Sequence, residues 1–369
     1  MGGAALAQLA AAFADDGAVM ADALAARRRP IRVLGVDAPR AHLAAWGFQP
    51  VRMAPPPMAH TPRADAIMGE AAMGQRGRRL IEALTNPDWF DVPVLMTQAD
   101  ATQPQIFAAL RELARLGQPG PRHVHFYDHM AQPRAASAKY NAHRLAQLDV
   151  WLAQMGGVAP DDAARARAHG DAAAQAGLID QLNQLRARRC LSGADALVAM
   201  GGAARLPLDM GNAALAQLAQ HVAAGAGADA GADSGAGALA GRPIILCGSA
   251  HDSDHIYRQI ESAGALIMAD VMDGGGDAMP MPARMCPPDA VGRHVAERAR
   301  ALGVGHVLHL SIDGDEAAPW DVAALHQWAG PSITVVAWRC TAQGGDALAE
   351  RLAALFDSPA APPAAAPAT

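Results

Sequence analysis

The sequence has few cysteines and few aromatic residues. Its four cysteines, Cys190, Cys247, Cys286 and Cys340, lie far apart and form no C-x-x-C pair. This spacing argues against a disulfide framework and against a zinc knuckle. Aromatic side chains make up only 4% of the 369 residues. The hydrophobic cores therefore have to be built mainly from Ala, Leu, Val and Ile.

The sequence also lacks membrane spans and the basic patches that bind nucleic acid. No apolar stretch approaches the roughly 20 residues that a membrane-spanning helix needs. The first 25 residues are apolar, but they lack a basic start and are interrupted by Asp15 and Asp16. They predict an N-terminal helix rather than a signal peptide. The net charge of −6 gives no electrostatic footprint for nucleic acid. We therefore expect a cytoplasmic protein with neither a nucleic-acid nor a membrane partner.

Short apolar runs alternate with helical stretches along the chain, which is typical of βαβ units and a parallel sheet. A chain of 369 residues is too long for one compact core. We expect an α/β fold with two Rossmann-like parallel-sheet domains, a helical connector and an N-terminal helix. The expected strands are 31–36, 92–96, 123–127, 243–247, 266–271, 306–312 and 333–338. The expected helices are 104–116, 134–155, 160–189, 252–263, 288–302, 319–329 and 344–356.

The sharpest domain boundary is segment 223–241, which consists almost wholly of Gly, Ala, Asp and Ser. Such a segment cannot bury enough apolar surface to order itself, so it predicts a flexible linker. The Pro/Ala-rich end of the chain predicts a disordered tail. The expected organisation is an N-terminal helical segment 1–29, a first α/β domain with helical connector 30–222, the linker 223–241, a second α/β domain 242–357 and the tail 358–369.

In parallel α/β sheets, ligands collect at the carboxyl ends of the strands, where helix N-termini also point. This rule nominates a polar rim in which carboxylates and histidines dominate. The nominated residues are Asp37, Gln98, Asp100, Asp128, His129, Ser249, His251, Asp252, His255, Asp270, Asp273, Asp313, Asp315, Arg339 and Cys340. We expect this rim to line a cleft between the two domains.

The segment 251–255 follows an expected strand and reads His-Asp-Ser-Asp-His. On a helix, His251 and His255 would share one face at i and i+4 and could hold a metal, although no third ligand is assigned. Alternatively, Ser253 or Asp252 caps the helix that follows.

Three histidines, His123, His125 and His129, lie in and just after another expected strand. Val124 and Phe126 would form the buried face of that strand. The histidines would then lie at a subunit contact or at the cleft rather than at a metal.

Several segments resemble, in order and spacing, the 2-hydroxyacyl-CoA dehydratase / benzoyl-CoA reductase family. Residues 39–47, PRAHLAAWG, and the following PVR at 50–52 resemble the family pattern P-E-E-L-I-x-A-A-G-x-x-P-V-R. Residues 140–152, YNAHRLAQLDVWL, resemble the helix pattern Y-x-x-x-E-L-x-R-L-x-x-W-L. Further similar segments are 156–160, 191–193, 256–264, 271–275, 293–307 and 346–356. The resemblance covers most of residues 30–357.

The resemblance breaks down where the family carries the cysteines of its iron–sulfur cluster. A Thr/Ser-Cys-Asp sequence is replaced by Gln98-Ala99-Asp100, and a later Phe-Cys-Asp by Asp313-Gly314-Asp315. The family's C-x-x-x-R stretch corresponds to residues 73–78, which contain no cysteine. A [4Fe–4S] cluster needs thiolate ligands, so we expect none here. A glutamate of the opening pattern is also replaced, by Ala41.

Family members work as paired homologous subunits that bind an acyl-CoA, and an electron from an ATP-dependent activator drives the reaction at the cluster. The resemblance thus implies a cluster-free subunit or paralogue that binds an acyl-CoA or a homologous partner, as a homo- or heterodimer. A second hypothesis is an enzyme that uses the rim Asp and His residues for acid–base or metal chemistry. A third is a cluster-bearing dehydratase or reductase subunit that uses its other cysteines, such as Cys286 and Cys340, or those of its partner.

Overall fold

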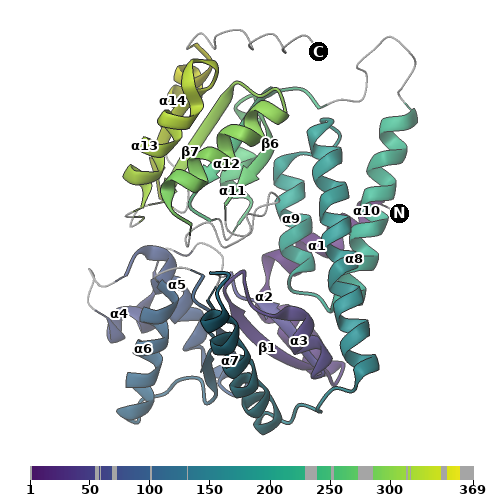
Figure 1. Ribbon diagram of the computed structural model, residues 1–369, viewed down its shortest axis with the longest axis vertical. Helices are drawn as coiled ribbons and strands as arrows, with labels where there is room; N and C mark the ends of the chain where they lie inside the picture. The colour runs from purple at the N-terminus through teal and green to yellow at the C-terminus, as the bar shows by residue number, and fades with distance from the viewer. Residues whose placement is uncertain are drawn as a thin grey trace. The chain divides into compact units, whose positions relative to one another are not determined.

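The computed structural model is an α/β protein with two four-stranded parallel sheets (Figure 1), which confirms the fold class expected from the sequence. It describes residues 2–54, 58, 60–68, 73–99, 102–130, 132–228, 239–250, 253–272, 286–312, 315, 317–341 and 347–357. The chain divides into two compact units. The N-terminal unit comprises Ala7–Leu178 and Gly201–Ala216, and the C-terminal unit comprises Met1–Leu6, Ile179–Met200 and Gln217–Thr369.

The sheet of the N-terminal unit has the strand order β2-β1-β3-β4. Its strands are β1 (Arg29–Leu34), β2 (Phe48–Arg52), β3 (Val94–Met96) and β4 (Val124–Phe126). All neighbouring strands are parallel, with Leu34 opposite Met96 and Leu95 opposite His125. The chain passes from β1 to β2 on one side of the sheet and then to β3 and β4 on the other side, so the order of the strands switches at β1. Open α/β sheets bind ligands outside the carboxyl ends of the strands at such a switch point.

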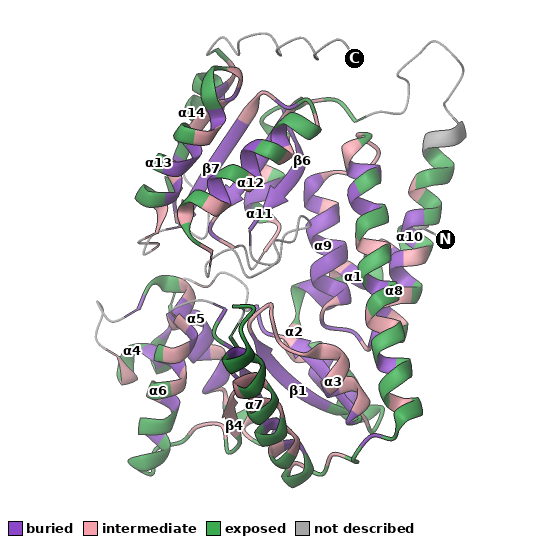
Figure 2. Ribbon diagram, viewed as in Figure 1, coloured by how far each residue is buried: buried purple, intermediate pink, exposed green. Residues whose placement is uncertain are grey.

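Helices cover both faces of this sheet. On one face, α4 (Pro62–Ile67), α5 (Gln75–Leu84) and α6 (Thr102–Arg115) pack against Val94 and Met96. On the other, α3 (Arg40–Ala45) and α7 (Ala135–Gln154) pack against Ile31 and Leu95. Successive side chains of a strand point to opposite faces, so Leu95 enters a different core from its neighbours. Figure 2 shows β1 buried along almost its whole length, as expected for a parallel strand covered on both faces.

The sheet of the C-terminal unit repeats this topology with the order β6-β5-β7-β8, again all parallel. Its strands are β5 (Arg242–Gly248), β6 (Ala265–Val271), β7 (His306–Ile312) and β8 (Thr334–Cys340), and its helices are α11 (His255–Ser262), α12 (Pro288–Ala301), α13 (Ala318–Ala329) and α14 (Leu348–Asp357). Val295 of α12 and Leu325 of α13 pack with Ile245 and Val307 in one core. The equivalent switch point lies at the carboxyl ends of β5 and β7.

Two helices, α1 (Gly2–Ala14) and α2 (Asp16–Ala25), precede the first sheet. Asp15 separates them, and its Oδ1 accepts a hydrogen bond of 2.9 Å from the Ala18 amide, which caps α2. Among the described residues, no single helix is long and apolar enough to cross a membrane. Taken together, Gly3–Ala14 and Asp16–Ala25 are long and apolar enough for a membrane span, but the two helices are bent by 103° relative to each other at the break between them.

The remaining long helices are α8 (Asp162–Ala187), α9 (Gly193–Ala203) and α10 (Leu208–Ala228), and the short 3-10 turns are Pro87–Trp89 and Gly330–Ser332.

The C-terminal turn of α9 packs on α1 through two glycines. A Cβ at Gly201 would lie 2.4 Å from the Phe13 ring, and one at Gly202 would lie 2.1 Å from the Leu9 carbonyl oxygen. Only glycine permits this close approach of two helices.

Several boundaries differ from the sequence prediction. β2 was not among the expected strands; it contains Pro50, which it tolerates because it lies at the edge of the sheet. Helix α10 extends to Ala228, into the predicted linker 223–241, since its alanines favour helix. Residues 179–200 and 217–222 belong to the C-terminal unit, not to the first domain 30–222, and most of 1–29 belongs to the N-terminal unit. Residues 229–238 and the tail 358–369 lie outside the described residues.

Candidate functional site

The loops that follow β1 and β3 approach each other closely at the switch point of the N-terminal unit. Gly35 follows β1 with φ +117°, and a Cβ at this position would lie only 1.7 Å from the Thr97 hydroxyl oxygen and 3.0 Å from Asp37 Oδ1. This backbone conformation and this space are available only to glycine. Gly35 therefore lets the β1 loop place Asp37 directly beside the end of β3.

Asp37 is held with one oxygen engaged and the other available. The Thr97 hydroxyl donates a hydrogen bond to Asp37 Oδ1, and Thr97 itself is fully buried. Asp37 Oδ2 is buried and has no hydrogen-bond partner among the described residues. The imidazole of His129 faces this oxygen, with Nδ1 at 3.6 Å from Asp37 Oδ2, which is too long for a hydrogen bond. The side chains of Asp37 and His129 are 8% and 28% exposed, so solvent reaches the imidazole but hardly the carboxylate.

The ring of Tyr127 stacks on the imidazole of His129. Their rings stack with centroids 6.1 Å apart and planes at 24°. Burial raises the pKa of Tyr127 above its ordinary value of 10.0, and the nearby charge of Asp37 raises it further. Tyr127 is therefore a neutral aromatic platform that fixes the ring plane of His129.

Asp128, which the sequence also nominated, is fully engaged in holding the loop after β4 onto α7. Arg144 Nε lies 2.6 Å from Asp128 Oδ1, and the Tyr140 hydroxyl donates to Asp128 Oδ2. Arg144 also donates to the carbonyl oxygen of Phe126. The hydrogen bond to Asp128 raises the pKa of Tyr140. With both oxygens engaged, Asp128 positions the loop that carries His129.

The other two histidines of this segment do not join the site. His125 stacks on Trp151 with centroids 5.0 Å apart, and burial together with the charge of Arg144 lowers its pKa to about 4. It is a neutral packing residue at physiological pH. His123 is exposed at the start of β4, and Val124 and Phe126 pack against the core as expected.

Gln98 is exposed at the end of β3. Asp100, nominated beside it, lies outside the described residues, as do His251, Asp252, Asp273 and Asp313. Arg339 is exposed on β8, and Cys340 is buried at the end of the same strand.

Ser249 and Asp315 are brought together at the switch point of the C-terminal unit. The Ser249 hydroxyl donates to Asp315 Oδ2 and accepts from the Ile312 amide at 3.0 Å. Asp315 Oδ1 accepts from the Ala317 amide at 3.1 Å. These bonds tie the loop after β7 to the end of β5. The pair thus has a structural role in holding these two loops together.

The predicted helical face shared by His251 and His255 stays a prediction, because His251 lies outside the described residues. Helix α11 begins at His255, which is exposed. The helix is not capped by Ser253 or Asp252: its N-cap residue is Asp254, whose Oδ2 accepts from Arg258 Nε at 2.5 Å. The carboxylate of Asp254 therefore pairs with the guanidinium of Arg258, one helical turn later, and accepts no hydrogen bond from the first amides of the helix.

Asp270 lies inside the unit rather than at the rim. It is fully buried in β6, with Arg186 Nη2 at 2.9 Å from its Oδ1. The Tyr257 hydroxyl donates to its other oxygen at 2.8 Å. Because every residue of β6 is buried, the sequence pattern could not separate an interior carboxylate from one at the strand end.

The residues at the positions of the family's cluster ligands do not fit an iron–sulfur cluster. Ala99, after β3, is 2% exposed. The place of the first family cysteine falls at Met73 or Gly74, before α5; Met73 is buried in the core that also contains Leu34 and Met96, whereas Gly74 is exposed. None of these residues supplies a thiolate. Gly314, the third position, lies outside the described residues.

The four cysteines, all within the described part of the chain, form no disulfide. Cys247 is buried in the core of the C-terminal unit, and Cys286 packs against that core. Among the residues that the structure describes, no three His, Cys, Asp or Glu side chains gather in a way that could hold a metal ion.

Sequence reasoning missed Thr97 and Tyr127. Thr97 is the first residue after β3, and Tyr127 is the first after β4, so the strand-end rule itself would have found them if it had been applied to hydroxyl and aromatic residues as well as to charged ones.

Comparison with known proteins identifies no family. No protein-family model matches the sequence, and no curated protein matches it. A solved structure that resembles the chain is that of the substrate-binding protein FpvC from P. aeruginosa in complex with a Ni²⁺ ion. It is 13% identical, and the match covers 90% of this chain and 95% of that chain with a TM-score of 0.20. A likeness at this score carries no argument about function.

Proposed function

We propose that this protein is a cluster-free relative of the 2-hydroxyacyl-CoA dehydratase scaffold, which binds an acyl-CoA thioester and pairs with a homologous subunit. The observation that carries the proposal is Ala99, which is buried and apolar where the resembling family has a thiolate. The place of the first family cysteine falls at Met73 or Gly74, and neither residue supplies a thiolate either.

The binding site in this proposal is the crevice between the ends of β1 and β3. The doubly covered parallel sheet directs ligands to this switch point, and Gln98, Asp37 and His129 lie around it. The crevice offers a carboxylate, an imidazole and an amide, which can hydrogen-bond the thioester carbonyl and the amides of a pantetheine arm.

Acyl-CoA binding is tested by isothermal titration of the full chain with acetyl-CoA and butyryl-CoA. We expect dissociation constants of about 1–100 µM, the range of metabolite sites. Gln98→Trp places an indole at the mouth of the crevice and should weaken binding about tenfold or more.

The matched control for this substitution is Gln118→Trp. Gln118 is exposed after α6, before β4 and thus at the amino end of the same sheet, so this variant should bind like the wild type. Absence of heat with every thioester at about 1 mM would contradict the acyl-CoA proposal.

A second candidate function, acid–base catalysis, is favoured by the arrangement of Asp37 and His129. The buried carboxylate of Asp37 lies 3.6 Å from Nδ1, so Nε2 is the ring nitrogen left to exchange a proton with a ligand. With an acyl thioester in the crevice, Nε2 would take the proton from C2. The electrons of the broken C2–H bond would pass into the thioester carbonyl to give an enolate, and return of a proton from the imidazolium would regenerate the thioester.

This second function predicts exchange of the C2 protons of butyryl-CoA with deuterium from solvent, measured by NMR. His129→Gln should slow the exchange about 100-fold or more, because it removes the group that moves the proton. His123→Gln is the matched control, since His123 is exposed at the other end of β4. Equal exchange rates for the two variants would exclude His129 as the base. That result would not contradict the separate proposal that the protein binds an acyl-CoA thioester.

A further inference from the structure

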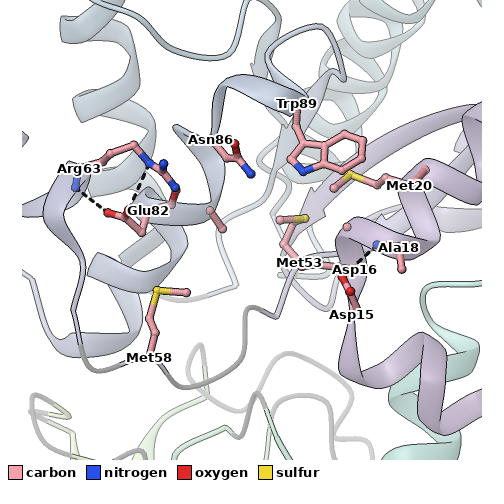
Figure 3. A pocket seen from close by; sticks show the side chains of 13 residues that line it. Asp15, Asp16, Ala18, Met20, Met53, Met58, Arg63, Glu82, Asn86 and Trp89 are labelled. Atoms are coloured by element: carbon pink, nitrogen blue, oxygen red, sulfur yellow. Dashed lines mark hydrogen bonds and ion pairs between the residues drawn. The ribbon is translucent and has the colours of Figure 1, made fainter.

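The N-terminal unit contains a cavity of about 450 Å³ that no part of the proposed function uses (Figure 3). It lies where α2, the chain after β2, α5 and the turn Pro87–Trp89 come together. Its apolar wall is made by Met20, Met53, Met58 and Trp89. The indole of Trp89 lies near Gly17 of α2: a Cβ at Gly17 would be 3.6 Å from its Cζ2. A volume of this size accommodates a small organic molecule.

The cavity also contains a carboxylate with one oxygen left without a partner. Asp16 lines the cavity at the start of α2. Its Oδ2 is buried and has no hydrogen-bond partner among the residues that the structure describes. Burial raises the pKa of Asp16 above its ordinary value of 3.8, and the charge of Arg205 and the backbone amides of Ala54 and Gly17 oppose this only in part. A buried carboxylate with a vacant acceptor lowers stability, and proteins keep such groups where a ligand uses them.

The other charged residues of the lining are already paired. Glu82 accepts hydrogen bonds from the amides of Arg63 and Ala64 at 2.8 and 3.0 Å, and the guanidinium of Arg63 lies 3.2 Å from it. Asp15 caps α2 through the Ala18 amide. Figure 3 shows the Arg63–Glu82 pair on one side of the cavity and Asp16 and Trp89 on the other. The one carboxylate of the lining that no lining residue pairs is therefore Asp16, on the side of the indole, with Arg205 compensating its charge only in part.

We propose that this cavity binds a small organic cation, with the ammonium group on Asp16 and the apolar body against Trp89 and the methionines. An ammonium ion supplies the hydrogen-bond donor that Asp16 Oδ2 lacks and forms a charge-assisted bond with it. The indole attracts the same cation through its π face. The thioethers of Met20, Met53 and Met58 are polarisable and adapt to ligands of different shape.

The experiment compares three probes with the same phenethyl body in isothermal titrations of the full chain: 2-phenylethylamine, 2-phenylethanol and 3-phenylpropionate. The amine should bind at least about tenfold more tightly than the alcohol, and the carboxylate should give no heat. Equal binding of the amine and the alcohol would overturn the proposal, because the charge on Asp16 would then play no part.

Two variants and one control locate the site. Asp16→Asn should weaken binding of the amine about tenfold or more, whereas Asp22→Asn, which removes an exposed carboxylate from the same helix, should leave it unchanged. Ala21→Trp should abolish binding by filling the cavity, which Ala21 lines, without touching Asp16. Wild-type affinity in either Asp16→Asn or Ala21→Trp would contradict the proposal.

Folding of the Asp16→Asn variant is checked by thermal unfolding without ligand. In the folded protein the pKa of Asp16 is raised, so the charged form destabilises the fold above that pKa and has no effect below the unfolded value of 3.8. The substitution should therefore raise the melting temperature at pH 7, and the difference should vanish as the pH falls below about 4. If the Asp16→Asn variant no longer binds the amine but melts at a higher temperature than the wild type, the loss of binding is not caused by a loss of folding.

Discussion

Replacing Arg205 with leucine should lower the free energy of unfolding of the N-terminal unit by about 4 kcal/mol or more. Arg205 is 1% exposed and donates to the carbonyl oxygens of Ala12, Arg52 and Ala54 at 3.0, 3.1 and 2.9 Å. It also donates to the carbonyl oxygen of Phe13, and its guanidinium lies over the Phe13 ring, 5.4 Å from the centroid.

The physical reason for this large effect is that one side chain satisfies acceptors from two separate segments. Without the guanidinium, the carbonyl groups at the end of α1 and after β2 stay buried without donors, and each such group costs about 1–3 kcal/mol. Calorimetry should show a fall in melting temperature of about 10 °C, and hydrogen exchange should show lost protection in α1 and β2.

The matched control for Arg205 is Arg122→Leu in the same unit. The Arg122 side chain is 69% exposed and pairs with Asp91 at 2.9 Å, so its removal should cost less than about 1 kcal/mol. A melting temperature of the Arg205→Leu variant that matches this control would refute the assigned role of Arg205.

The second large effect is expected at the buried pair Arg186–Asp270 of the C-terminal unit. Both side chains are fully buried, 2.9 Å apart, and the Tyr257 hydroxyl donates to Asp270. Burial, and then the charge of Asp270, raise the pKa of Tyr257 far above its ordinary value of 10.0, so the phenol stays a donor at every physiological pH. Arg186→Met or Asp270→Asn alone should each cost about 3–5 kcal/mol, because each leaves one charge buried without its partner.

The double variant Arg186→Met, Asp270→Asn should be more stable than either single variant. Both charges are then gone, and the asparagine oxygen still accepts from Tyr257. Urea titration of the four proteins gives the coupling energy of the pair. The same cycle on the exposed pair Arg258–Asp254, 2.5 Å apart, should give no more than about 0.5 kcal/mol. Additive losses at Arg186 and Asp270 would show that the two charges do not depend on each other.

The sequence predicted the α/β class and most strands, because buried parallel strands are continuous apolar runs between amphipathic helices. It did not predict β2, where Pro50 is tolerated only because the strand lies at an edge. It predicted one N-terminal helix, whereas the acidic pair at 15–16 ends one helix and caps another. Local patterns identify helices and strands well, but the exceptions depend on tertiary position.

The candidate site was only partly predictable for a similar reason. The strand-end rule nominated Asp37 and His129, but their approach to 3.6 Å depends on the register of three strands and on the loop at Gly35. Asp270 was assigned to the rim because β6 is buried along its whole length, so its sequence does not alternate between polar and apolar residues and does not show which side chains point inward. The cavity at Asp16 could not be inferred, since its walls come from distant segments.

The most direct test of the proposed function is the content of iron and acid-labile sulfide per chain. The protein should be purified without oxygen and then incubated with iron, sulfide and reductant, so that any competent site can fill. Because Ala99, and Met73 or Gly74, stand at the ligand positions and supply no thiolate, we expect no more than trace iron before and after reconstitution. About four irons with matching sulfide would contradict the proposal and restore a cluster-bearing enzyme.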